Sequence, residues 1–335
     1  MARRSRAATI ADVATHAGVS PATVSRVMNG RFVGDPAVAD RVRASALALD
    51  YRPSHLARSL ALGQTSAVAF VVPDLANPAF QAVLSSLSKT AAHDGYRVLV
   101  ADSAETPSDE PLLAAEVRRR CDAIVLCAPR MSDEELAALA GELQPLVLIN
   151  RVPPGIRTPA LSIDYQKGIV KLAQHLYELG HRRMLYLEGP ASSASNAHRV
   201  AGLEDFAART KGVRIDRMAA GAGAEDGRAA AAKVRSSKAT AALAYNDLVA
   251  IGLIDGLQEL GLSVPDDISV TGFDDIPFAR YTSPSLTTAS VPHAELGVQA
   301  WRRMIALIRH EDPEHDVQFQ PRLEIRRSTA APATR

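Results

Sequence analysis

The sequence has little cysteine and no long apolar run. Its only cysteines, Cys121 and Cys127, stand six positions apart in the strand-like run "CDAIVLC". Six residues of a strand span roughly 20 Å, whereas a disulfide requires Cα atoms closer than about 7 Å. Two thiols that cannot pair fit a reducing compartment, so we expect them to fill the core of a cytoplasmic protein. No run of about 18 apolar residues exists, so we expect no contact with a membrane, and no apolar signal-peptide core follows the basic N-terminus.

An excess of charge is also missing, because 38 Lys and Arg oppose 37 Asp and Glu. The charges are nevertheless unevenly distributed. Residues 1–63 contain nine Arg, four Asp and neither Lys nor Glu, a net charge of +5, which leaves −4 for the remainder. A basic segment ahead of a mildly acidic body predicts an appended domain that binds a polyanion. The alternative is a basic tail without function.

Sequence patterns of catalysis and cofactor binding are absent as well. The glycines of "GAGAEDG" are spaced one residue too long for a dinucleotide fingerprint, and no clear strand precedes them. The adjacent carboxylates Asp274 and Asp275 do not face a common bond, and Asp275 is expected to be structural. His181, His198 and His293 lack the spacing of metal ligands. We therefore expect no enzyme, no metal and no cofactor.

The first 50 residues carry the start and stop signals of three short helices. Thr9 can cap "IADVATHAG", and Gly18 ends that helix. Ser20 can cap the next helix, and Asp35-Pro36 is a start signal for "AVADRVRASALALDY". The first two helices are joined by a short turn that contains glycine. This spacing is typical of a helix-turn-helix.

From Ala67 onward, apolar strand-like runs alternate with helical stretches. The runs are "AVAFVV", "YRVLV", "CDAIVLC", "PLVLI", "RMLYLE", "ATAALA" and "ISVTGF". This alternation predicts parallel sheets that are covered on both faces by helices. About 270 residues with two such series predict two doubly wound subdomains, with a binding cleft at the carboxyl ends of their strands.

Seven motifs in sequence order resemble the LacI-type bacterial transcriptional regulators. "TIADVATHAGVSPATVSRVMNG" is similar to the headpiece of that family, and "YRPSHLARSLALGQT" is similar to its hinge. The stretches "VVPDLANPAF", "ELGHRRMLYLEGP", "AYNDLVAIGLIDGL", "VPDDISVTGFDDIPFARYTSPSLTT" and "LEIRRST" follow its core. The resemblance implies an all-α headpiece, an α/β core like that of periplasmic binding proteins, and a homodimer. It also implies a roughly palindromic operator DNA as partner and control by a small molecule.

The resemblance assigns DNA contacts to the headpiece and the hinge. It implies base readers at Pro21, Ala22 and Arg26, phosphate contacts at Thr9, Ser20, Thr23, Ser25 and Asn29, and a minor-groove wedge at Leu60. Helical spacing independently leaves Arg26 exposed, and an arginine can contact a guanine edge with two hydrogen bonds. The alternatives are that Ser20 and Thr23 only cap a helix, that Arg26 is a solvated charge, and that Leu60 packs against the core.

The resemblance also assigns effector contacts, all in loops that converge on the cleft. They are Asn77, Ala79, Phe80, Asn150, Arg151, Asp164, Ser193, Ser195, Arg199, Asn246 and Asp274. Arg199 and Asp274 are expected to clamp a ring whose apolar face lies on Phe80. Ala79 and Ala222 stand where relatives often have an aromatic residue. Fewer stacking surfaces favour a sugar or sugar derivative over a flat purine, and they are compatible with a disaccharide.

These observations predict a cytoplasmic repressor of carbohydrate use that associates with the nucleoid through its operator. We expect a helix-turn-helix domain at 8–52, a hinge at 53–65 and an effector-binding and dimerisation core at 66–335. One core subdomain is expected at about 66–161 with 291–318, and the other at about 162–290 with 319–330. The alternatives are a sugar-binding protein without a regulatory role, a regulator that responds to a nucleoside or another metabolite, and a carbohydrate enzyme.

Overall fold

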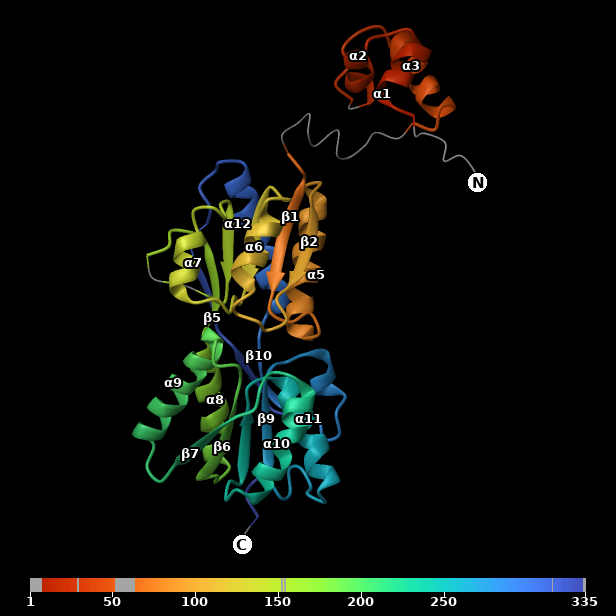
Figure 1. Cartoon of the computed structure of the whole chain (residues 1–335). Helices are drawn as coiled ribbons and strands as arrows, with labels where there is room; N and C mark the ends of the chain where they lie inside the picture. The colour runs from red at the N-terminus through yellow and green to blue at the C-terminus, as the bar shows by residue number, and fades with distance from the viewer. Residues whose placement is uncertain are drawn as a thin grey trace. The chain divides into compact units, whose positions relative to one another are not determined.

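The computed structural model of the chain describes residues 8–28, 30–51, 64–151, 153, 155–314 and 316–333. The chain divides into two compact units, the headpiece (residues 1–65) and the core (residues 66–335) (Figure 1). In the described part of the chain, no helix combines the length and the apolar character that crossing a membrane requires.

The headpiece contains three helices around a small apolar core. They are α1 (Ile10–Ala17), α2 (Pro21–Met28) and α3 (Pro36–Ala48). The Thr9 hydroxyl accepts the Asp12 N–H while the Asp12 carboxylate accepts the Thr9 N–H, so the predicted capping of α1 is confirmed. Gly18 ends α1 with a left-handed φ of 64°. The helices enclose the buried side chains of Val13, Ala14, Ala17, Val24, Val27, Ala39, Val42 and Ala46.

The first sheet of the core is entirely parallel, with the strand order β11-β5-β4-β3-β1-β2. Its strands are β1 (Ala67–Val72), β2 (Arg97–Asp102), β3 (Ala123–Cys127), β4 (Leu146–Ile149), β5 (Ala160–Ile163) and β11 (Val317–Phe319). Its helices are α5 (Pro78–His93), α6 (Glu110–Arg118), α7 (Asp133–Leu139) and α12 (His293–Ile308). Phe70 of β1 packs with α5 and α12 while its neighbour Val71 packs with α6 and α7, so helices cover both faces.

The second sheet has the order β12-β10-β9-β8-β6-β7, and only β12 is antiparallel to its neighbour. Its strands are β6 (Arg183–Glu188), β7 (Arg214–Ala219), β8 (Ala241–Ala244), β9 (Ser269–Asp274), β10 (Thr287–Ser290) and β12 (Arg322–Glu324). Its helices are α8 (Tyr165–Glu178), α9 (Ala194–Arg209), α10 (Ala224–Ser236) and α11 (Asp247–Glu259), with a 3₁₀ helix η1 at Pro277–Arg280. Helices α8 and α9 pack on one face, and α10 and α11 pack on the other. The core thus has the predicted doubly wound architecture.

The chain passes between the two sheets after β5, after β10 and between β11 and β12 (Figure 1). Each subdomain is therefore built from separate segments of the chain. The crossing segments are tied together, because the Asp164 N–H donates to the Phe319 carbonyl oxygen at 2.9 Å. The carboxyl ends of the parallel strands face the region between the subdomains, where a cleft is expected.

Several elements were not predicted from the sequence patterns. Strands β5, β7, β10, β11 and β12 and helix α6 lack a long apolar run, and β7 is a half-exposed edge strand. The statement that no strand precedes the glycine loop was wrong, because β7 ends directly before it. Cys121 lies before β3 rather than inside it, and both thiols are buried and free. Helix α9 begins at Ala194, because the Ser193 hydroxyl caps it.

Candidate functional site

The second helix of the headpiece exposes the expected base readers. Pro21, Ala22 and Arg26 are exposed, whereas Val24 and Val27 of the same helix are buried in the headpiece core. This division follows helical periodicity, which places residues three and four apart on one face. The exposed face of α2 therefore presents one cation and two small apolar residues.

Three of the expected phosphate contacts, Ser20, Thr23 and Ser25, lie at the start of α2 or within it. The Ser20 hydroxyl accepts the Thr23 N–H at 3.2 Å and lies 2.9 Å from the Thr23 hydroxyl, so Ser20 also serves as a helix cap. Thr9 has the same double role at the start of α1. Asn29 and Leu60 lie outside the described residues, as does most of the expected hinge.

Strained backbone in the core is concentrated at the carboxyl ends of the strands. Of the eight core residues other than glycine that have a positive φ in the described part of the chain, six follow or end β2, β3, β4 and β9: Ala104 (49°), Glu105 (53°), Ala128 (50°), Asn150 (59°), Asp274 (111°) and Asp275 (57°). Such conformations cost of order 1–3 kcal/mol each and cluster at functional sites in proteins. Their common location identifies this region as the candidate site of the core.

A small cavity of about 30 Å³, here called the inner chamber, lies at these strand ends. It is lined by eight of the eleven predicted effector contacts: Asn77, Ala79, Phe80, Asn150, Ser195, Arg199, Asn246 and Asp274. Arg151 and Ser193 line a second cavity of about 920 Å³, here called the outer chamber. Asp164 lines neither chamber, because its carboxylate caps α8 and accepts the Gln320 side-chain N–H at 3.1 Å.

Arg199 is the buried cation of the inner chamber. Its side chain comes from α9 and is 2% exposed. Its guanidinium carbon lies 4.0, 4.4 and 4.7 Å from the ring centroids of Phe273, Tyr165 and Tyr245, within the range of cation–π interactions. Its Nε and Nη1 have no hydrogen-bond partner among the described residues. Because a buried N–H without an acceptor is costly, this arrangement favours a ligand that supplies acceptor oxygens.

Asp274 and His293 face each other at the inner chamber. The His293 Nε2 lies 3.8 Å from the Asp274 Oδ1. Burial raises the pKa of Asp274 to about 7, although the nearby Arg199 cation opposes this shift. Burial lowers the pKa of His293 to about 4, so its ring is neutral at pH 7. A carboxyl beside a neutral imidazole offers both an acceptor and a donor, which suits a ligand hydroxyl group.

The other polar residues of the site also hold its loops in place. The Asn77 side chain caps α5, and the Asn246 side chain caps α11 while donating to the Ala222 carbonyl oxygen at 2.8 Å. The Ser193 hydroxyl lies 2.9 Å from both the Ser195 hydroxyl and the Tyr245 hydroxyl. These bonds fix the side chains before any ligand is present.

The neighbouring carboxylates are structural. Asp275 accepts from Arg326 at 2.5 Å, which agrees with the expectation that this residue is structural. The fully buried Asp247 was not predicted, and it accepts the Thr288 hydroxyl at 2.6 Å and the Ile276 N–H at 2.8 Å. Burial raises the pKa of Asp247 well above its usual value. Neither carboxylate lines a chamber.

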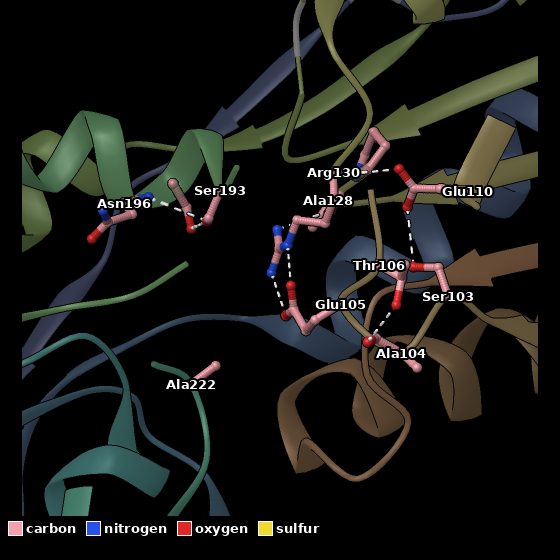
Figure 2. Close-up of polar contacts among 12 residues, drawn as sticks. Ser103, Ala104, Glu105, Thr106, Glu110, Ala128, Arg130, Ser193, Asn196 and Ala222 are labelled. Carbon is pink, nitrogen blue, oxygen red and sulfur yellow. Dashed lines mark hydrogen bonds and ion pairs between the residues drawn. The ribbon is translucent and has the colours of Figure 1, made fainter. Parts of the chain in front are cut away.

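Sequence reasoning missed an ion pair at the junction of the two chambers. Arg130, which follows β3, is 4% exposed and donates to the Glu105 carboxylate from Nε at 2.6 Å and from Nη2 at 2.8 Å. The buried Glu110 carboxylate accepts the backbone N–H groups of Arg130 and Met131 at 2.6 and 2.7 Å. Figure 2 shows the Arg130 side chain directed at Glu105 and its backbone directed at Glu110. One signal was available, since Arg130 is a charged residue that stands three positions after a strand ending at the cleft.

Comparisons with known proteins agree with this architecture. The family model described as bacterial regulatory proteins of the lacI family matches residues 9–54, and that of the periplasmic binding protein-like domain matches residues 173–329. The HTH-type transcriptional regulator GalR of Escherichia coli (strain K12) is 33% identical over 332 residues, which are 97% of each chain. The Lac repressor dimer bound to operator and the anti-inducer ONPF is 25% identical, with a TM-score of 0.85 over 97% of this chain and 100% of that chain.

A third similar protein is a LacI family transcriptional regulator from Enterococcus faecium with bound ribose. It is 25% identical, with a TM-score of 0.71 over 79% of this chain and 99% of that chain. The matches therefore extend from the helix-turn-helix through both subdomains of the core. The chain belongs to the LacI family of bacterial transcriptional regulators.

Proposed function

We propose that this regulator represses transcription by binding operator DNA as a homodimer, and that a carbohydrate bound in the cleft of the core controls this binding. It would act in the bacterial cytoplasm, where the DNA is. The observation that carries the proposal is Arg199, a buried cation with two N–H groups that lack acceptors, beside the carboxyl of Asp274. The bound ribose of the Enterococcus faecium regulator supports a sugar as the ligand class.

The headpiece supplies the DNA-binding surface in this proposal. We assign it to residues 8–52, followed by a hinge at 53–65 with Leu60 as minor-groove wedge. Arg26 is exposed on α2 and can form two hydrogen bonds to a guanine edge. The hydroxyls of Thr9, Ser20, Thr23 and Ser25 and the amide of Asn29 are proposed to contact phosphates. Because Pro21 and Ala22 are small and apolar, they are limited to contacts such as that with a thymine methyl group.

An exposed apolar surface on the core supports a homodimer. Leu99 and Val100 of β2 are 47% and 42% exposed, and Leu112 of α6 is 64% exposed. Strand β2 is an edge of its sheet, and an open edge with apolar side chains is normally covered. The Lac repressor that this chain resembles is a dimer on its operator. A two-fold symmetric dimer requires two related half-sites, hence a roughly palindromic operator.

The effector acts by favouring one arrangement of the two subdomains over another. Asn77, Ala79, Phe80, Asn150, Arg151, Ser193, Ser195, Arg199, Asn246 and Asp274 are its proposed contacts, all lining one of the two chambers. Paired donors and acceptors match vicinal hydroxyl groups. A ligand changes operator affinity only if it binds the two arrangements with different affinity.

Electrophoretic mobility shift with the DNA upstream of the gene tests the proposal, with and without a panel of saccharides. We expect a specific shift whose midpoint changes with the effective sugar. Arg26→Ala should weaken specific binding by about 1–3 kcal/mol and relax the sequence preference at one base pair. Arg43→Ala is the matched control, because Arg43 is an exposed arginine of α3 that lies outside the proposed base-reading helix.

Three outcomes would contradict the proposal. An unchanged sequence preference in Arg26→Ala would show that Arg26 does not read a base. The absence of any specific shift would leave a sugar-binding protein without a regulatory role. A shift that no sugar alters would show that the effector belongs to another class of metabolite.

A further inference from the structure

A further cavity lies in the second subdomain, outside the two chambers. It has a volume of about 620 Å³ and is here called the arginine pocket. Its lining comes from the end of α11, the loop between α11 and β9, the segment from η1 to β10, and Arg327 beyond β12. None of these lining residues also lines the inner or the outer chamber. A ligand in the arginine pocket is therefore a separate ligand from one bound in the cleft.

The arginine pocket is lined by hydrogen-bond donors that have no partner within the protein. The Arg327 guanidinium is exposed and forms no hydrogen bond or ion pair with the residues that the structure describes. The hydroxyls of Ser263, Ser283 and Ser285 also lack a partner in that part of the chain. Arginine presents a planar fork of N–H groups that matches phosphate and carboxylate oxygens. The pocket thus offers N–H and O–H groups to a ligand with several acceptor oxygens.

Arg280, the second arginine of the pocket, is only partly neutralised. Its side chain is 64% exposed, and its Nη2 lies 3.5 Å from the Asp275 Oδ2. The Asp275 Oδ1 already accepts the Arg326 Nη2 at 2.5 Å. Because one carboxylate cannot neutralise two arginines, Arg280 keeps positive charge that can attract a second anion.

Carboxylates are missing from the lining of the arginine pocket, as far as the described residues show. The Asp267 carboxylate belongs to the loop between α11 and β9, where it accepts the Ser263 N–H at 2.8 Å without lining the pocket. Two arginines in a concave surface raise the local positive potential and concentrate anions there. A phosphate monoester carries a charge of about −1.5 to −2 at pH 7, so it gains more from this potential than a carboxylate does.

The size and the apolar part of the pocket favour a phosphorylated molecule over a free inorganic ion. A volume of about 620 Å³ falls within the range of roughly 300–1,000 Å³ typical of small-molecule sites. Val264, Pro265 and Pro284 contribute apolar surface to the lining. This surface can contact the carbon skeleton that carries a phosphate group.

We propose that the arginine pocket binds the phosphate group of a small phosphorylated metabolite, at a site separate from the cleft. Arg280 and Arg327 pair with the phosphate oxygens, and the serine hydroxyls of the lining donate to the oxygens that remain. The regulator thereby has a second ligand, which can be bound together with a ligand of the cleft. This inference does not depend on the proposed carbohydrate control.

Replacement of Arg327 gives a matched test. Arg327→Gln removes a guanidinium that has no partner among the described residues, so no internal contact of the fold is lost. Arg183→Gln is the control, because Arg183 is an exposed arginine of β6 in the same subdomain that does not line the pocket. Its side chain likewise has no partner in the described part of the chain. Both variants remove one positive charge, so they change the net charge of the protein equally.

Isothermal titration of the full-length protein at pH 8 and constant ionic strength measures binding. The probes are glycerol 3-phosphate, inorganic phosphate, acetate and glycerol. We expect both phosphates to bind more tightly than acetate, glycerol 3-phosphate to bind more tightly than inorganic phosphate, and glycerol to give no binding. An exposed ion pair contributes up to a factor of about five in affinity, and a bidentate arginine contact contributes more. Arg327→Gln should therefore raise the Kd of both phosphates at least about fivefold, and Arg183→Gln should leave both values unchanged.

Several results would overturn the inference. An Arg327→Gln variant that binds both phosphates as tightly as the wild type would place their binding elsewhere, and the absence of binding by both would leave the pocket without this ligand. Acetate or glycerol that binds as tightly as the phosphates would exclude recognition of the phosphate group. Altered sedimentation of Arg327→Gln would assign the pocket to a contact between copies of the chain. None of these outcomes affects the proposed carbohydrate control, which the mobility shift tests separately.

Discussion

Replacement of Arg199 by methionine would test the proposed effector site directly. The Arg199 side chain is 2% exposed between the rings of Tyr165, Tyr245 and Phe273, and its Nε and Nη1 lack hydrogen-bond partners in the described part of the chain. Methionine is apolar and of comparable length, so it can occupy the same space among the rings. We therefore expect Arg199→Met to fold and to bind operator DNA.

The choice of methionine follows from the expected free energies of unfolding. Replacing a buried ionic group by a well-packed apolar residue is often neutral or stabilising, so a change within about 1.5 kcal/mol is expected for Arg199→Met. Arg199→Ala would instead leave a cavity, at a cost of about 2–5 kcal/mol. The methionine variant thus separates the loss of ligand binding from the loss of folding.

The effect on the effector is expected to be much larger. A hydrogen bond to a charged donor contributes about 1.5–3 kcal/mol. The loss of one such bond raises the Kd of the effector roughly 10- to 150-fold, and the loss of the bonds from both Nε and Nη1 raises it further. The operator complex of Arg199→Met should then remain unchanged at effector concentrations that alter the wild-type complex.

The assay is titration calorimetry with the tightest saccharide, together with mobility shift on operator DNA. Arg303→Met is the matched control, because Arg303 is an arginine of α12 that is 1% exposed and lines neither chamber. Its replacement should leave the Kd of the effector unchanged. An unchanged Kd in Arg199→Met as well would refute the placement of the effector at this cation.

Three further predictions address the charge, the assembly and the packing of the core. Burial raises the pKa of Asp274 to about 7, and the ionised form, which the nearby Arg199 cation favours, is the one that accepts hydrogen bonds from ligand hydroxyls through both oxygens. Effector affinity should therefore rise from pH 6 to pH 8 in the wild type and stay flat in Asp274→Asn, and a flat wild-type profile would contradict this role. Leu99→Asp should weaken the dimer by roughly 1.5–3 kcal/mol or more in analytical ultracentrifugation, because each copy would bury the exposed half of one leucine in the interface. An unchanged dimer would show that β2 lies outside the interface. Gly252→Ala places a Cβ 1.7 Å from the Ala224 carbonyl oxygen and should lower the free energy of unfolding by at least about 1–3 kcal/mol. In Gly141→Ala the added Cβ meets no described atom within 4 Å, so the free energy of unfolding should stay within about 0.5 kcal/mol of the wild-type value. Denaturant titration measures both variants, and equal free energies of unfolding would exclude a steric cause.

Elements with strong local signals were predicted from the sequence. The capping of α1 by Thr9 depends on residues three positions apart, and the runs of β1, β3, β4 and β8 are buried along their whole length. Strands β10, β11 and β12 were not predicted, because they have three or four residues each and only their partners stabilise them. Short strands carry little signal of their own, since much of their stability comes from cross-strand contacts.

The residues of the candidate cleft were likewise predicted only in part. Family resemblance named eight residues that line the inner chamber, but it missed Arg130, Tyr245 and His293. The Arg130–Glu105 pair joins residues 25 positions apart, and the rings around Arg199 come from three separate elements. No periodicity or spacing in the sequence predicts that these side chains lie in contact.

The sequence by itself determined the helix-turn-helix, the doubly wound class of the core and the family, because caps, apolar periodicity and ordered motifs are local properties. Only the tertiary structure decided which charges are paired, which buried polar atoms lack partners and how large the two chambers are. These properties depend on side chains that converge from strand ends far apart in the chain. The physical reason is that desolvation and hydrogen-bond satisfaction are set by three-dimensional surroundings rather than by neighbours in sequence.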